Sequence, residues 1–167
     1  MSTVGTMETL FERPLLDSLP AEFVCDFTVD LGPPLLISTP RGKLVQYIGK
    51  GRRVEGPRLH GEFLTSVDWV VLGTDGMTRL DIRGSIRTDD GALIYFETRG
   101  VVKLPPDGRE RLMKGERLAF EGTYIRTTPK LETSDERYSW LNDFVLVSYN
   151  ELSLAPPRMD FRMYRIL

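Results

Sequence analysis

The feature that most constrains the fold is an alternation of apolar and polar residues with a period of two, which is the spacing of side chains on opposite faces of a β-strand. The clearest example is EFVCDFTVD at 22–30, where Phe23, Cys25, Phe27 and Val29 are expected to share one face. Similar patterns predict further strands at 43–49, 62–73, 77–87, 92–102, 143–152 and 159–167. Many strands joined by short turns favour an antiparallel sandwich or barrel.

Two kinds of segment interrupt this pattern. The stretch GPPLLISTPRG at 32–42 contains three prolines and predicts a loop. The segment 109–118 can hold a short helix, and Ser134, Asp135 and Glu136 provide the residue types that begin one. The expected protein is therefore all-β, with at most one or two short helices.

Composition excludes several classes of protein. A chain of 167 residues suits a single domain spanning 1–167. Lys and Arg number 22 against 24 Asp and Glu, a net charge of −2, so no charge excess indicates nucleic acid or an anionic membrane as a partner. No apolar run is long enough to cross a bilayer, and the first residues lack a signal-peptide pattern. The expected location is cytoplasmic.

The sequence offers no set of residues for a metal or a nucleotide cofactor. It contains one cysteine, Cys25, and one histidine, His60, too few for an internal disulfide or a structural zinc site. It has neither a P-loop nor a dinucleotide fingerprint, and no GxSxG motif accompanies His60. Cys25 is expected to be a small core residue. We expect no cofactor.

The sequence Asp89-Asp90-Gly91 is interpreted as a three-residue hairpin loop between two strands. That loop places Arg83 opposite Glu97 and Asp81 opposite Arg99, whereas a two-residue loop would lose both charge pairs. The two aspartates are therefore predicted to be turn residues and not metal ligands.

The predicted hairpin is amphipathic. Its apolar face carries Ile82, Ile86, Ile94 and Phe96. Its polar face is either a solvated charge ladder or the lining of a cavity, and the pattern alone favours solvent because buried charges are costly. That face consists of Asp81, Arg83, Arg87, Tyr95, Glu97 and Arg99.

Four blocks occur in a specific order: VEGPRLHGEF at 54–63, VDW at 67–69, LDIRGSIRTDDGALIY at 80–95 and LETSDERYSWLN at 131–142. Together they resemble the domain-of-unknown-function 3237 family of UPF0311-like β-barrel proteins, over roughly residues 7–150. The resemblance implies a calycin-like antiparallel barrel and no agreed activity. Leu131 stands where the family usually has phenylalanine. The family motifs map onto Arg58, Asp68, Trp69, Asp81, Arg83, Tyr95, Glu132, Tyr138, Trp140 and Asn142.

Among these residues Glu132 is the leading candidate for a catalytic acid or base. Beside Tyr138 and Trp140 its carboxyl group would be partly desolvated, which would raise its pKa toward neutrality. The equally weighted alternative is a hydrogen bond that the Glu132 carboxylate accepts from the backbone of the next turn. Asp81 is the second candidate proton carrier.

The other candidates have assisting roles, each with a plain structural alternative. Arg83 or Arg58 could stabilise developing negative charge, or could belong to surface ion pairs. Asp68 is unusual inside a strand and needs a partner, which a neighbouring loop could supply. The aromatic wall and polar contacts of the expected site comprise Trp69, Tyr95, Tyr138, Trp140, Arg58, His60, Asp68 and Asn142.

Three functions remain open. The first is cofactor-independent acid–base catalysis, of isomerase, cyclase, dehydratase (lyase) or lactone hydrolase type, on a small carbonyl-bearing molecule inside the barrel, as in secondary metabolism. The second is a non-catalytic small-molecule carrier, which needs the aromatic wall but no titrating carboxylate. The third is a structural homodimer or larger homo-oligomer. Neither nucleic acid nor a membrane is an expected partner.

Overall fold

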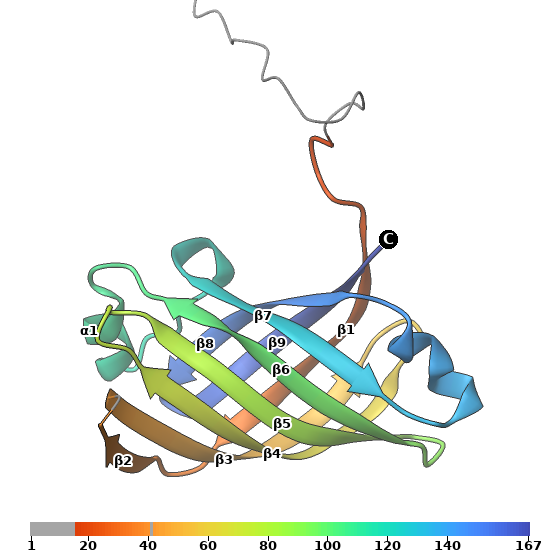
Figure 1. Cartoon of the computed structure of the whole chain (residues 1–167), viewed down its shortest axis with the longest axis horizontal. Helices are drawn as coiled ribbons and strands as arrows, with labels where there is room; N and C mark the ends of the chain where they lie inside the picture. Colours follow the sequence, from red (N-terminus) through yellow and green to blue (C-terminus); the bar gives the residue numbers. More distant parts are fainter. Residues whose placement is uncertain (1–15, 41) are drawn as a thin grey trace, which may run out of the picture.

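A computed structural model describes residues 16–40 and 42–167. All of its strands belong to one antiparallel sheet that closes into a barrel (Figure 1). The strands are β1 (Ala21–Leu31), β2 (Leu35–Thr39), β3 (Gly42–Glu55), β4 (His60–Leu72), β5 (Thr78–Thr88), β6 (Leu93–Lys103), β7 (Tyr124–Glu132), β8 (Leu146–Leu154) and β9 (Pro157–Ile166). The predicted antiparallel barrel is confirmed.

The barrel closes because β1 pairs with two strands at once. One edge of β1 runs against β9, from Ala21–Ile166 to Asp30–Arg158. The other edge runs against β3, from Asp26–Glu55 to Leu31–Gly49. Eight strands complete the ring, and β2 is an additional strand that pairs only with β3.

Two segments differ from the sequence-based expectation. The predicted loop at 32–42 contains strand β2, because its prolines flank Leu35–Thr39 and do not interrupt it. Strand β7 was not predicted, because Pro129 lies inside it and proline cannot donate to a ladder. The β7–β8 ladder contains only Arg126–Tyr149 and Thr127–Ser148. No residue of β8 is therefore paired with Pro129, so the missing N–H of proline breaks no hydrogen bond to β8.

Four phenylalanine rings fill the middle of the barrel. Phe27 stacks on Phe63 at 4.9 Å and on Phe161 at 4.7 Å between ring centroids. Phe96 meets these rings edge-on, for example Phe63 at 5.2 Å. The rings come from β1, β4, β6 and β9, so this cluster joins strands from opposite parts of the ring. Gly84 makes room for it, because a Cβ there would lie 2.7 Å from Phe63.

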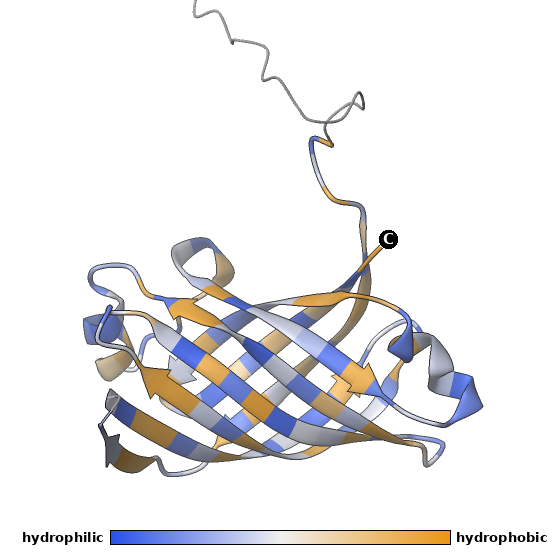
Figure 2. Ribbon diagram, in the orientation of Figure 1, coloured by the Kyte–Doolittle hydropathy of each residue, from blue (hydrophilic) through white to orange (hydrophobic). Residues whose placement is uncertain are grey.

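Side chains alternate between the inside and the outside along each strand, as the bands of colour in Figure 2 illustrate. Cys25, Phe27 and Val29 are buried as expected. Phe23 is not on their face: a bulge between Phe23 and Cys25 shifts the register by one residue. Phe23 therefore packs edge-on against Tyr164, at 6.0 Å.

Short helical segments lie at the two ends of the barrel (Figure 1). Helix α1 (Gly108–Met113) confirms the short helix expected in 109–118. Residues Glu136–Asn142 form the 3₁₀ helix η2, with Asp135 as its N-cap accepting from the Arg137 backbone N–H. A single 3₁₀ turn, η1 (Phe120–Gly122), precedes β7.

The β5–β6 hairpin has the predicted register. Arg83 lies opposite Glu97, and Asp81 lies opposite Arg99. The loop Asp89-Asp90-Gly91 is closed by hydrogen bonds between Thr88 and Ala92, and Gly91 has a φ of +91°. Only glycine adopts that conformation without a steric cost.

We predict that Gly91→Val destabilises the protein by about 1 kcal/mol or more, because a β-branched residue resists positive φ. Asp89→Asn should cost less than about 1 kcal/mol, because asparagine serves the same turn. Thermal melts of both variants measure this. Gly122→Val is the matched control, since neither Gly91 nor Gly122 has an atom within 4 Å of the added Cβ, and only Gly91 has positive φ. Equal losses at Gly91 and Gly122 would contradict the turn assignment.

Candidate functional site

The residues expected to form one site lie in three separate parts of the barrel. One group closes the barrel end beside η2, a second lies on the outer wall, and a single residue, Asp68, points into the interior. Each group has its own contacts, and these decide what chemistry it can support.

The first group is structural. Trp140 packs against the core, and the guanidinium group of Arg58 lies 4.1 Å above its ring. The Asn142 side chain accepts from the Thr133 backbone N–H and donates to the Thr133 carbonyl, so it fixes the chain on both sides of η2. His60 is exposed and contacts Glu55 through Nδ1 at 3.0 Å. Trp140 and Asn142 thus hold η2 over the end of the barrel, while His60 belongs to an exposed ion pair.

The loop aspartates belong to the same closed end. The Asp90 carboxylate accepts from the Thr88 hydroxyl at 2.5 Å and from the Tyr138 hydroxyl at 2.9 Å. The Thr88 bond is the main cause of the lowered pKa of Asp90. Asp89 forms an ion pair with Arg53 on β3. The two aspartates are thus turn residues that also attach the hairpin to η2 and to β3.

The second group forms a solvated ladder on the outer wall. Asp81 lies 3.4 Å from Arg83 and 3.3 Å from Arg99, and all three side chains are at least one-third exposed. The Tyr95 hydroxyl donates to Glu97 at 2.8 Å. Trp69 is the outward neighbour of Asp81 on β4 and is partly buried.

The expectation that the Glu132 carboxyl group is desolvated beside Tyr138 and Trp140 is wrong. Its side chain is 51% exposed and forms an ion pair with Lys130 at 2.7 Å. The reason is the strand period: Leu131 points into the core, so Glu132, the next residue, must point outward. Tyr138 and Trp140 are close to Glu132 in sequence, but they belong to η2 at the closed end.

Asp68 is the one candidate that faces the interior. Its side chain is 4% exposed, and Oδ1 has no hydrogen-bond partner among the described residues. Burial, and secondarily the charge of Asp81, raises the pKa of Asp68 to about 7. Its cross-strand neighbour on β3 is Tyr47, whose pKa is raised by its own burial and then by Asp68.

Further polar residues continue from Asp68 around the inside of the barrel. Ile82 separates Asp68 from Thr98. Thr127 and Ser148 share a hydrogen bond of 2.6 Å across the β7–β8 seam, and Ser148 donates to Asn150 at 3.0 Å. We call these residues the inner polar band, which consists of Asp68, Thr98, Thr127, Ser148 and Asn150; each is at most 4% exposed.

The inner polar band has unused hydrogen-bonding capacity. Besides Asp68 Oδ1, the hydroxyl of Thr98 and the amide Nδ2 of Asn150 lack a partner among the described residues. Buried polar groups are normally paired with protein, water or a ligand, because leaving one unpaired costs about 1–3 kcal/mol. Sequence reasoning missed Thr98, Thr127, Ser148 and Asn150. The available signal was their position at inward-facing places of otherwise apolar strand faces.

The apolar residues that flank Asp68 toward the barrel end away from η2 are slightly less buried than those nearer η2. Val45, Val70 and Leu80 keep 5–8% exposure there, and Tyr47 is only partly buried. By contrast, Phe63, Phe96, Leu131 and Leu141, deeper in the barrel and toward η2, have at most 1% exposure.

The described residues contain no group of three or more His, Cys, Asp or Glu side chains placed to hold a metal ion. Cys25 is fully buried, and burial raises the pKa of its thiol, which makes it a core residue and not a nucleophile. In the described part of the chain, no helix has the length and apolar character needed to cross a membrane.

The family model described as "Protein of unknown function (DUF3237)" matches residues 20–166. A UPF0311 protein of Clostridium acetobutylicum is 30% identical over 150 residues, covering 87% of this chain and 92% of the relative. The part of the sequence resemblance at residues 7–15 lies outside the described residues.

Solved structures share the fold. A conserved protein of unknown function from Rhodopseudomonas palustris has a TM-score of 0.83 at 23% identity, covering 91% of this chain and 100% of that one. A protein from Penicillium herquei, called an enzyme, has a TM-score of 0.65 at 19% identity, covering 95% and 100%. At these identities the two structures show the fold alone.

The position of Asp68 leads to a prediction about stability. An aspartate with a pKa of 3.8 in the unfolded chain and about 7 in the fold binds more protons when folded, so stability should fall as pH rises from about 4 to 8. The full difference is roughly 4 kcal/mol. Asp68→Asn should remove this fall, which urea unfolding at several pH values measures.

Asp17→Asn, at an exposed position, controls for the loss of one carboxylate. A wild-type protein whose pH dependence matches that of Asp68→Asn would show that Asp68 titrates normally.

Proposed function

Because the chain belongs to the DUF3237 family, a family of unknown function, we propose its function from the barrel itself: cofactor-independent acid–base catalysis on a small molecule held in the interior. The observation that carries this proposal is Asp68, an interior carboxyl group with a pKa of about 7 and an oxygen without a hydrogen-bond partner among the described residues. A group that titrates near neutral pH can both accept and return a proton.

The neighbours of Asp68 suit this role. Asp68 would remove a proton from carbon or oxygen of the substrate, and would return it later in the reaction. The hydroxyl of Tyr47, the cross-strand neighbour of Asp68, and that of Thr98, next to Ile82, are the interior donors that could stabilise a developing enolate or alkoxide. Arg83 and Glu132, expected earlier as stabiliser and proton carrier, lie on the outer wall and are replaced in these roles.

The interior also limits the substrate. An eight-stranded barrel is just wide enough to be filled by side chains or to hold one small ligand, so a ligand beside the phenylalanine cluster must be small. The surroundings of the inner polar band are apolar, including Ile82, Val70 and the phenylalanine cluster. The proposed substrate is therefore a small, fairly apolar carbonyl compound, and the reaction is an isomerisation, cyclisation, dehydration or lactone hydrolysis.

The second candidate function is a non-catalytic carrier for the same class of molecule. It is favoured by the outward position of Glu132, because the carboxylate expected from sequence to do chemistry is on the surface. The similarity to the Penicillium herquei enzyme supports the catalytic alternative only at the level of a shared fold. The two functions differ in what Asp68 does after a ligand binds.

Exchange of the α-protons of 2-tetralone in D₂O, followed by NMR, tests the proposal. The wild-type protein should accelerate exchange, with a rate that rises as pH increases through about 7 and Asp68 ionises. Asp68→Asn should lower the rate by about 100-fold or more, the usual contribution of a positioned base. Glu132→Gln, the matched carboxylate control on the outer wall, should match the wild type.

A carrier would give a different set of results. The wild type would bind 2-tetralone without accelerating exchange, and Asp68→Asn would leave the exchange rate unchanged. Loss of exchange in Glu132→Gln but not in Asp68→Asn would overturn the assignment of Asp68.

A further inference from the structure

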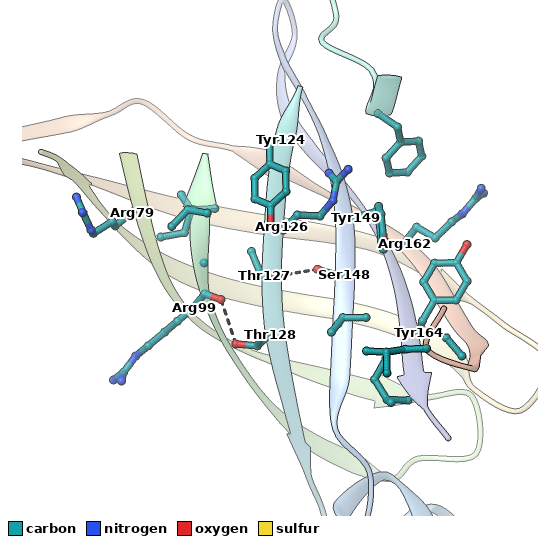
Figure 3. A pocket seen from close by; sticks show the side chains of 18 of the residues that line it. Arg79, Arg99, Tyr124, Arg126, Thr127, Thr128, Ser148, Tyr149, Arg162 and Tyr164 are labelled. Atoms are coloured by element: carbon teal, nitrogen blue, oxygen red, sulfur yellow. Dashed lines mark hydrogen bonds between the residues drawn. The ribbon is translucent and has the colours of Figure 1, made fainter. Parts of the chain in front are cut away.

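We propose that the outer wall carries a second binding site, for a flat, apolar molecule with an anionic group, and that Arg126 recognises the anion. The site is an open groove of about 1260 Å³ over β5 to β9, and Thr127 and Ser148 of the inner polar band also line it (Figure 3). Its existence does not depend on catalysis by Asp68.

The groove follows the weakest seam of the barrel. Strands β7 and β8 are paired only at Arg126–Tyr149 and Thr127–Ser148, whereas β8 and β9 are paired along their whole length, from Leu146–Arg165 to Leu154–Pro157. All four of these residues at the β7–β8 seam line the groove. Gly100 on β6, without a side chain, also lies in the groove floor.

The Arg126 side chain lies in the middle of this groove, and its neighbours fix its position. Its guanidinium carbon lies 4.2 Å from the ring centroid of Tyr149 and 5.0 Å from that of Tyr124. One of its nitrogens, Nη1, donates to the Ile125 carbonyl at 3.1 Å. Figure 3 shows Arg126 reaching from β7 toward β8, while Arg79 and Arg99 point away from this centre.

The charge of Arg126 is not neutralised. The other arginines of the groove each have a carboxylate: Arg79 pairs with Asp75, Arg99 with Asp81 and Arg162 with Asp26. Arg126 forms no ion pair with any described residue. A guanidinium fixed by stacking, with free N–H donors, matches a carboxylate or sulfonate and loses little entropy on binding it.

The walls beside Arg126 determine the rest of the ligand. Val101, Val147 and Ile166 contribute aliphatic surface, and Tyr124, Tyr149 and Tyr164 contribute rings. An aromatic body can pack against these side chains while its anionic group faces Arg126. The volume of the groove exceeds the roughly 300–1,000 Å³ of usual small-molecule sites, so a two- or three-ring ligand fits easily.

The probe for this site is 8-anilinonaphthalene-1-sulfonate, a flat apolar anion whose fluorescence increases on binding. The full chain should bind it saturably, and Arg126→Gln should weaken binding by roughly 10- to 100-fold, the effect of losing a charge-assisted contact. N-phenyl-1-naphthylamine, which has the same rings without the sulfonate, should bind weakly and equally to both proteins.

Two control variants separate this site from others. Arg87→Gln removes an exposed arginine that pairs with Glu62 outside the groove and should leave probe binding unchanged. Asp68→Asn should also leave it unchanged. Binding that depends on Asp68 and not on Arg126 would place the probe in the interior and overturn this proposal, whatever the outcome for catalysis.

The oligomeric state provides the remaining test. Sedimentation of the wild type and of Arg126→Gln should give the same mass. A wild-type dimer that dissociates in Arg126→Gln, together with a failure to bind the probe, would show that a second copy of the chain occupies the groove and would overturn the small-molecule site.

Discussion

The structure depends on β1 pairing with two strands at once. Without the β1–β3 ladder the sheet would end at β1 on one side and at β2 on the other, and its backbone groups at both edges would be open to other chains. The same strand carries Phe27, which stacks on Phe63 and Phe161. Closure by hydrogen bonds and closure by ring packing therefore reinforce each other, and every inward-facing side chain is assigned its position by the resulting ring.

The family motifs are explained largely by the closed end. Arg58, Asp90, Tyr138 and Trp140 come from separate parts of the sequence, and they meet where η2 covers the barrel. Their hydrogen bonds and stacking contacts fix η2, whose Leu141 is part of the core. Residues that look like a catalytic set in sequence thus hold the end of the barrel in place.

Sequence predicted local geometry better than it predicted the site. The β5–β6 register followed from opposite charges at fixed spacing, and the short helix α1 from its local pattern. Strand β7 was missed because Pro129 is atypical within a strand, and Phe23 was misplaced because a bulge cannot be read from alternation. Glu132 was misplaced for a related reason: proximity in sequence to aromatic residues does not determine on which side of a strand a residue lies.

The interior placement of Asp68 is costly, and that cost is the strongest argument that it has a use. Aspartate is disfavoured in strands. Burying its side chain without a hydrogen-bond partner adds a second free-energy cost. Carboxylates at neighbouring outward positions are solvated and ion-paired, as Asp81 is. At such positions a charged side chain costs little folding free energy. A valine or isoleucine at position 68 would fit between Tyr47 and Ile82 without this penalty. Stability is commonly given up at functional sites, where polar groups must be available to a ligand and not satisfied by the protein itself. The inner polar band is therefore where the demands of folding and of function conflict in this barrel, and Asp68 is the residue at which the conflict is greatest.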